Sequence, residues 1–228
     1  MTGLWHHVQS RSCNPPPVAR MIETDMDELH SAPYPIVLRL EAQRCAVFGS
    51  GHEAESKTAA LEAAGARVAR SESYDPALIE GATLVISAGP DRSQNARIFA
   101  DCTARGILVN CLDDPPHCRF TFPSIHRQGD LTIAVSTNGA CPALAVRIRE
   151  TLGRSYGPEY AKFLEICRSV RRRITESIPE FGVRRALWYR IVESPAIGLL
   201  GHGRDEEAAR AVSSLIEQAA NDKPEAQE

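Results

Sequence analysis

Small residues at a fixed spacing mark the first place in this sequence where chemistry could occur. Residues 49–54 read GSGHEA, the pattern G-x-G-x-x-A, after a short apolar run and before a stretch of helix formers. In such a strand-turn-helix context, Gly49 permits a tight turn and Gly51 lets the backbone approach a pyrophosphate at the helix N-terminus. The pattern predicts a dinucleotide-binding turn, and an ordinary strand-to-helix turn is the alternative. The residues expected to contact the cofactor here are Gly49, Gly51, His52 and Glu53.

Residues after the next two predicted strands, at 66–70 and 83–88, predict the rest of the cofactor site. Glu72 follows the strand at 66–70, where a carboxylate can accept hydrogen bonds from an adenosine ribose and repel a 2'-phosphate. This favours NAD over NADP, although Arg70 argues in the opposite direction and Glu72 could instead be a solvated loop residue. The other expected contacts are Ser71, Ala88 and Gly89.

Two acidic residues follow another apolar run, at residues 107–111. Asp113 and Asp114 would lie at the carboxyl edge of a sheet, where ligands bind in open α/β proteins. A carboxylate there can take up a proton, but Asp-Asp-Pro-Pro is also ordinary turn chemistry.

Polar residues also precede the helix expected from Pro142. Ser136, Thr137 and Asn138 offer hydroxyl, amide and backbone donors suited to binding carboxylates. Capping of the helix is the competing interpretation.

Strands and helices alternate through the first half of the chain. This order predicts an α/β, Rossmann-like, doubly wound and mainly parallel sheet. A small α+β unit with strands at 120–123 and 131–136, joined through 128–130, should follow, and then helices. The expected domains are a disordered leader at 1–33, a Rossmann-like domain at 34–114, a small dimerisation region at 115–150, a helical domain at 151–220 and a tail at 221–228.

Composition limits the classes of partner. The formal charge of -3 gives no general attraction to nucleic acid or to anionic membranes, and no run of ~20 apolar residues predicts a membrane span. Seven cysteines, an odd and scattered set, predict reduced thiols and a cytoplasmic protein. Only Cys111, His117 and Cys118 cluster, so no metal site is expected.

Four segments together resemble precorrin-2 dehydrogenases, including the N-terminal part of bifunctional siroheme synthases. They are residues 34–38, 49–57, 109–115, and 122–125 with 133–144. The resemblance implies NAD-dependent oxidation of the tetrapyrrole precorrin-2 to sirohydrochlorin in a homodimer, in some members combined with insertion of ferrous iron as a substrate. It assigns the catalytic carboxylate to Asp113. The substrate's carboxylates imply a cationic pocket, for which the candidates are Arg119, His126, Arg127, Arg147 and Arg149.

The chain departs from this family after Arg70. A helix and one strand that the family has there are missing, so the second strand should become an edge of the sheet. The loss falls beside the adenosine half of the cofactor site. Two alternatives therefore stay open: a Rossmann protein that binds a tetrapyrrole or a partner protein without turnover, and a chelatase that no longer uses NAD.

Overall fold

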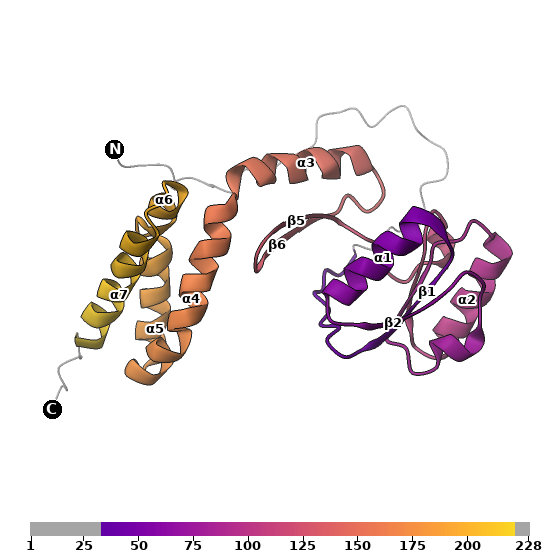
Figure 1. The fold of residues 1–228 in the computed structure, drawn as a ribbon, viewed down its shortest axis with the longest axis horizontal. Helices are drawn as coiled ribbons and strands as arrows, with labels where there is room; N and C mark the ends of the chain where they lie inside the picture. The colour runs from indigo at the N-terminus through magenta and orange to yellow at the C-terminus, as the bar shows by residue number, and fades with distance from the viewer. Residues whose placement is uncertain (1–32, 222–228) are drawn as a thin grey trace, which may run out of the picture. The chain divides into compact units, whose positions relative to one another are not determined.

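The computed structural model describes residues 33–221, drawn in colour in Figure 1. The leader predicted for 1–33 and the tail predicted for 221–228 lie almost entirely outside the described residues. Of the described residues, 37–221 belong to one compact unit.

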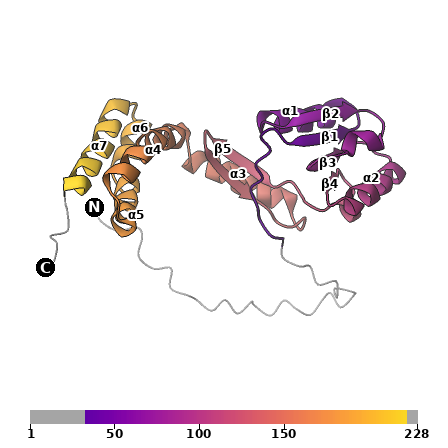
Figure 2. The same cartoon turned by 90° about the horizontal axis from the view of Figure 1, so that it is seen from below.

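The first half of this unit is a four-stranded parallel sheet in the order β2-β1-β3-β4. The strands are β1 (Arg44–Phe48), β2 (Arg67–Ser71), β3 (Leu84–Ser87) and β4 (Leu108–Cys111). Helices α1 (Gly51–Ala63) and α2 (Arg92–Ala104) cover opposite faces, each over its own apolar core, as Figure 2 shows. Because both faces are covered, β1 and β3 are almost continuously apolar, and the prediction of a doubly wound sheet is confirmed.

The β2 strand lies at the edge of the sheet, as the missing segment predicts. The chain passes directly from β2 to β3 through one 3-10 turn, η1 (Pro76–Ile79). Tyr74 holds this short crossover: its ring packs edge-on against Phe48 at 5.1 Å between centroids, and its hydroxyl donates to Asp101 at 2.5 Å. Burial raises the pKa of Tyr74 well above its usual value, and the bond to Asp101 raises it further, so the hydroxyl keeps its proton.

A β-hairpin and a helix follow. Strands β5 (Ser124–Gln128) and β6 (Leu131–Val135) pair antiparallel, and Gly129, at φ +55°, forms the predicted turn. The prediction of a strand over 120–123 is wrong, because these residues form no strand. Pro123 has no N–H to donate to a ladder, and pairing begins just after it, at Ser124.

The helix expected from Pro142 is α3 (Pro142–Ser155), which contacts both strands of the hairpin. Leu144, Ile148 and Leu152 recur every four residues along this helix and form an apolar face that residues 33–221 leave partly exposed. Leu144 is 50% exposed and Ile148 is 39% exposed.

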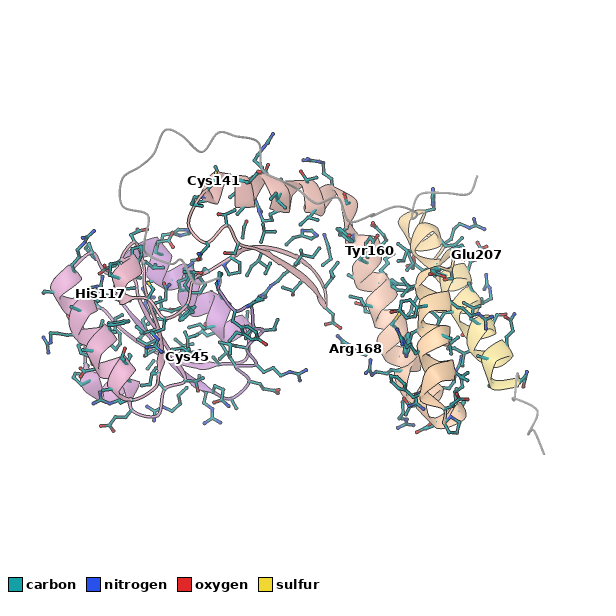
Figure 3. The ribbon with its side chains drawn as sticks, turned by 180° about the vertical axis from the view of Figure 1, so that it is seen from behind. Cys45, His117, Cys141, Tyr160, Arg168 and Glu207 are labelled. Atoms are coloured by element: carbon teal, nitrogen blue, oxygen red, sulfur yellow. The ribbon has the colours of Figure 1, made fainter. Side chains whose placement is uncertain are left out.

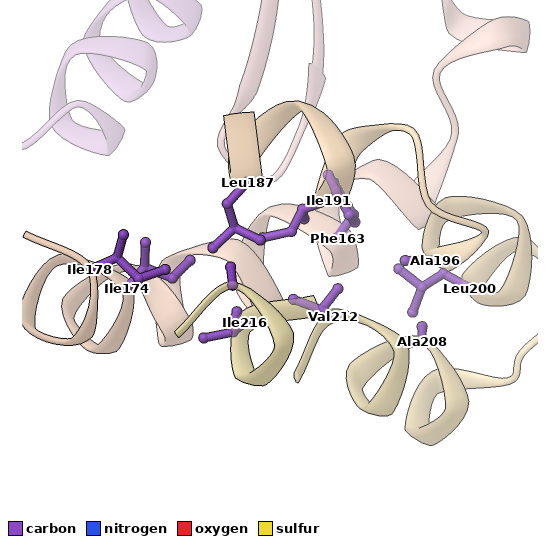
Figure 4. Close-up of a cluster of buried hydrophobic side chains, with 11 residues drawn as sticks. Phe163, Ile174, Ile178, Leu187, Ile191, Ala196, Leu200, Ala208, Val212 and Ile216 are labelled. Carbon is purple, nitrogen blue, oxygen red and sulfur yellow. The ribbon is translucent and has the colours of Figure 1, made fainter. Parts of the chain in front are cut away.

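Four helices complete the described chain: α4 (Pro158–Ser177), α5 (Phe181–Val192), α6 (Ala196–Gly201) and α7 (Asp205–Asn221). They share a core in which Phe163, Leu187 and Val212 are at most 5% exposed, shown in Figure 4. The predicted helical region is confirmed. No helix within residues 33–221 is long and apolar enough to cross a membrane.

Candidate functional site

The glycine turn joins β1 to α1, and its first glycine packs against the neighbouring loop. Gly49 is buried, has φ +119°, and donates its N–H to the Ser71 carbonyl at 2.9 Å. A Cβ at this position would lie 2.8 Å from the Ala88 carbonyl carbon and 3.0 Å from the Gly89 nitrogen. Glycine is therefore required at 49 so that the loop after β3 can lie directly against the turn. The sequence predicts the tight turn but not this close approach.

The second glycine faces open space. Gly51 has φ +79°, and apart from its chain neighbours and the backbone of its own helix, no atom of residues 33–221 lies within 4 Å of an added Cβ. The N-cap residue of α1, Ser50, makes no side-chain cap, so it leaves the N–H groups of the first turn free to donate to a ligand. An open glycine beside uncapped N–H donors fits a pyrophosphate. Glu53 in the same turn opposes it, because its carboxylate carries the same sign of charge.

A cleft of about 330 Å³ opens beside this turn, at the carboxyl ends of β3 and β4. Four predicted site residues line it. The full lining is Glu53, Ala88, Gly89, Pro90, Arg92, Asn95, Leu112, Asp113 and Asp114. The other predicted cofactor residues do not line it: Gly49, Gly51, His52, Ser71 and Glu72. The Ser71 hydroxyl donates instead to the Ser73 carbonyl at 2.7 Å.

Asp113 is held at the cleft by a loop fixed at both ends. The Leu112 N–H donates to the Ser87 carbonyl at 2.8 Å, and the Arg119 N–H donates to the Val109 carbonyl at 2.8 Å. Between these bonds, Asp113 adopts φ +58°, a left-handed conformation that is uncommon outside glycine. Its side chain is exposed and makes no hydrogen bond or ion pair with residues 33–221. This carboxylate is thus free to accept a proton from a ligand.

Asp114, the competing carboxylate, is buried and already engaged. Its Oδ2 accepts from Asn95 Nδ2 at 3.1 Å and lies 2.9 Å from His117 Nδ1, and Ser87 Oγ donates to Asn95 Oδ1 at 2.7 Å. Figure 3 labels His117 on this loop. The bond to His117, followed by the bond to Asn95, holds the pKa of Asp114 below its usual value against the effect of burial. This arrangement favours Asp113 over Asp114 as the proton acceptor.

This buried polar network is a feature that the sequence-based analysis misses. Two signals could have indicated it. Asn95 is a polar residue on the buried face of α2, and the 3-10 turn η2 (Pro115–His117) brings His117 back over Asp114.

The cysteines near the cleft are structural. Cys118 Sγ accepts from the Cys111 N–H at 3.3 Å and lies 3.2 Å from the Cys111 carbonyl, which closes the loop that carries Asp113. Burial raises the pKa of Cys111 to about 12 and also raises that of Cys118, so neither is a thiolate. The cysteines within residues 33–221 are free, and no three His, Cys, Asp or Glu side chains in that range gather closely enough to hold a metal ion.

The loop before α3 uses two of its hydroxyls locally. Thr137 Oγ1 accepts from the Cys141 N–H at 3.3 Å, and Ser136 Oγ accepts from the Asn138 N–H at 3.2 Å. Thr137 thereby binds Cys141, the residue before the first residue of α3, and neither bond is made to an N–H group of the helix itself. None of the three lines the 330 Å³ cleft. The structure therefore does not bring them together with Asp113.

Three protein families match consecutive segments of this chain. Residues 69–124 match the family described as "Putative NAD(P)-binding", 128–155 the sirohaem biosynthesis protein central region, and 159–216 the sirohaem synthase dimerisation region. Siroheme synthases of Methylococcus capsulatus and Chromobacterium violaceum are 31% and 34% identical, over 82% and 78% of this chain. The chain spans only 44% and 42% of those relatives.

A solved structure shares the fold. It is SirC, a precorrin-2 dehydrogenase, with a TM-score of 0.61 and 19% sequence identity. The match covers 80% of this chain and 100% of the other.

Proposed function

The chain belongs to the siroheme synthase family over most of its length, and we propose that it oxidises precorrin-2 to sirohydrochlorin with NAD as the hydride acceptor. The observation that carries the proposal is one cleft lined both by Glu53, in the first turn of the helix that follows the glycine turn, and by a free carboxylate, Asp113. The dinucleotide, when bound, supplies the two-electron acceptor.

Asp113 is the proposed catalytic residue. Oxidation of the reduced macrocycle removes a hydride and a proton, and the hydride passes to the cofactor. The Asp113 carboxylate takes up the proton. Its left-handed backbone supports this role, because strained residues held by surrounding bonds cluster at functional sites.

The remaining site residues are assigned by their positions. Gly49 and Gly51 shape the turn for the pyrophosphate, with Ala88 and Gly89 packed beside it, and Glu72 at the end of β2 favours NAD over NADP. Two further contacts with the cofactor are proposed for His52 and Ser71.

Substrate binding and assembly complete the proposal. Ser136, Thr137 and Asn138 contribute backbone and amide donors to the substrate's carboxylates. The chain acts as a homodimer, which the match to a dimerisation region and the exposed apolar residues of α3 support. Functional domains are proposed at 34–114, 115–150 and 151–220; the family matches, at 69–124, 128–155 and 159–216, support three regions in this order.

The test is anaerobic absorbance spectroscopy of precorrin-2 mixed with the full chain, with and without NAD. We expect NAD-dependent appearance of sirohydrochlorin that is lost in Asp113→Asn, with Asp130→Asn on the hairpin turn as a matched control that retains it. Tetrapyrrole binding without NAD-dependent oxidation would refute the dehydrogenase and support a binding protein. Addition of ferrous iron to sirohydrochlorin in the same cuvette tests for a chelatase.

A further inference from the structure

The cleft that holds Asp113 is predominantly acidic. Its lining includes the carboxylates of Glu53, Asp113 and Asp114. Among the lining residues, all within 33–221, Arg92 is the one cation. An anionic ligand group that enters this cleft would therefore be attracted to one side chain and repelled by its neighbours.

Arg92 has no direct bonding partner among residues 33–221, although its charge is the smallest of the contributions that lower the pKa of Asp114. It is exposed and forms no ion pair or hydrogen bond with any residue from 33 to 221. It occupies the first turn of α2, where a positive charge opposes the helix dipole. Its five N–H donors thus remain available to a ligand.

The start of α2 itself offers few donors to compete with Arg92. Asp91 caps the helix: its Oδ1 accepts from the Ser93 N–H at 2.8 Å, the Ser93 hydroxyl at 2.7 Å and the Gln94 N–H at 3.3 Å. Pro90, on the other side, has no N–H. The guanidinium is therefore the principal anion-binding group on this wall of the cleft.

We propose that Arg92 binds a carboxylate of the tetrapyrrole and so positions the macrocycle against Asp113. The inference rests on the proposed function and deepens it. The pyrophosphate of the cofactor is assigned to the glycine turn, at Gly51 and the first turn of α1, of which only Glu53 lines the cleft. A guanidinium pairs bidentately with carboxylates and with phosphates. Because the pyrophosphate is assigned to the glycine turn, Arg92 is left as the group that binds the substrate's carboxylate.

The test compares Arg92→Gln with Arg97→Gln, an exposed arginine of the same helix that does not line the cleft. Steady-state oxidation of precorrin-2 gives KM and kcat, and separate titrations give Kd for NAD and for sirohydrochlorin. We expect Arg92→Gln to raise KM and the Kd for sirohydrochlorin by about 10- to 100-fold, the effect of a lost charge-assisted hydrogen bond. The Kd for NAD should change less than about twofold, and Arg92→Lys should restore part of the loss.

Two results would overturn the inference. One is a KM for precorrin-2 and a Kd for sirohydrochlorin that match those of Arg97→Gln. The other is a loss confined to NAD, which would make Arg92 a phosphate-binding residue. If the wild-type chain binds sirohydrochlorin without oxidising precorrin-2, the proposed function fails, and the sirohydrochlorin titration still decides the role of Arg92.

Discussion

Alanine substitutions at the two glycines of the β1–α1 turn should have different consequences. Both glycines have positive φ, +119° at Gly49 and +79° at Gly51. Only Gly49 is crowded, since a Cβ there meets the backbone of Ala88 and Gly89 at 2.8 to 3.0 Å. Neither neighbour can move without displacing the loop after β3.

The expected destabilisation follows from these two contributions. An L-residue at the backbone angles of Gly49 costs roughly 1–3 kcal/mol. Overpacking against backbone costs roughly another 1–3 kcal/mol. Gly49→Ala should therefore destabilise the Rossmann-like sheet by about 2–6 kcal/mol. Gly51→Ala has only a backbone cost, about 1–2 kcal/mol, but its methyl group enters the space assigned to the pyrophosphate.

Native-state hydrogen exchange of the β1 and β3 amides is the appropriate assay, because it reports the stability of the sheet separately from that of the helical region. Titration with NAD gives the second measurement. We expect Gly49→Ala to lose protection, and Gly51→Ala to keep most protection while it loses NAD affinity. Equal protection losses in the two variants would refute the packing argument. Unchanged NAD affinity in Gly51→Ala would refute the placement of the pyrophosphate.

Three other perturbations test the charges and polar packing around the cleft. Glu53→Gln should raise NAD affinity by roughly 2- to 5-fold, because a like charge beside the pyrophosphate is removed; an unchanged Kd at low salt contradicts this. Asn95→Ala should destabilise the sheet by roughly 1–3 kcal/mol, because the Ser87 hydroxyl loses its acceptor, and hydrogen exchange of β3 measures the loss. Asp114 has a lowered pKa in the folded state, so the stability it provides is present above its ordinary pKa of about 3.9 and is lost as the pH falls through the folded value. In Asp114→Asn, the free energy of unfolding measured in urea should therefore fall less steeply as the pH is lowered. An identical pH dependence in the variant would show that the Asp114 carboxylate does not contribute to stability.

The order of the sheet could be predicted because local patterns determine it. The strands β1, β3 and β4 are short, mainly apolar runs, and β1, α1 and β2 follow one another without interruption. The edge strand β2 reads RVARS and is more polar. The missing segment after Arg70 predicts the edge position of β2, which the pairing confirms. The prediction of a strand at 120–123, in contrast, is wrong. Its composition is typical of a strand, whereas pairing depends on where N–H donors face a partner, and Pro123 has none.

The contacts that distinguish Asp113 from Asp114 could not be read from the sequence. The two residues are adjacent and chemically identical, and their environments are set by groups 19 residues earlier and three residues later. Asn95 and His117 engage one carboxylate and leave the other exposed. Arg92 was likewise not predicted as a site residue, because its position in the cleft depends on how α2 begins relative to β4.

The shortened sheet separates the two halves of the proposed cofactor site. The glycine turn, the loop after β3 and the Asp113 loop all follow strands β1, β3 and β4, which remain adjacent in the sheet. The loss of an outer strand therefore leaves the reacting end of the cleft complete. The adenosine end depends on β2, now an edge strand, and on Glu72, which is exposed beyond it. The adenosine contacts change little between the bound ground state and the transition state, and such uniform contacts contribute to KM without raising kcat. The truncation should therefore raise the KM for NAD more than it lowers kcat.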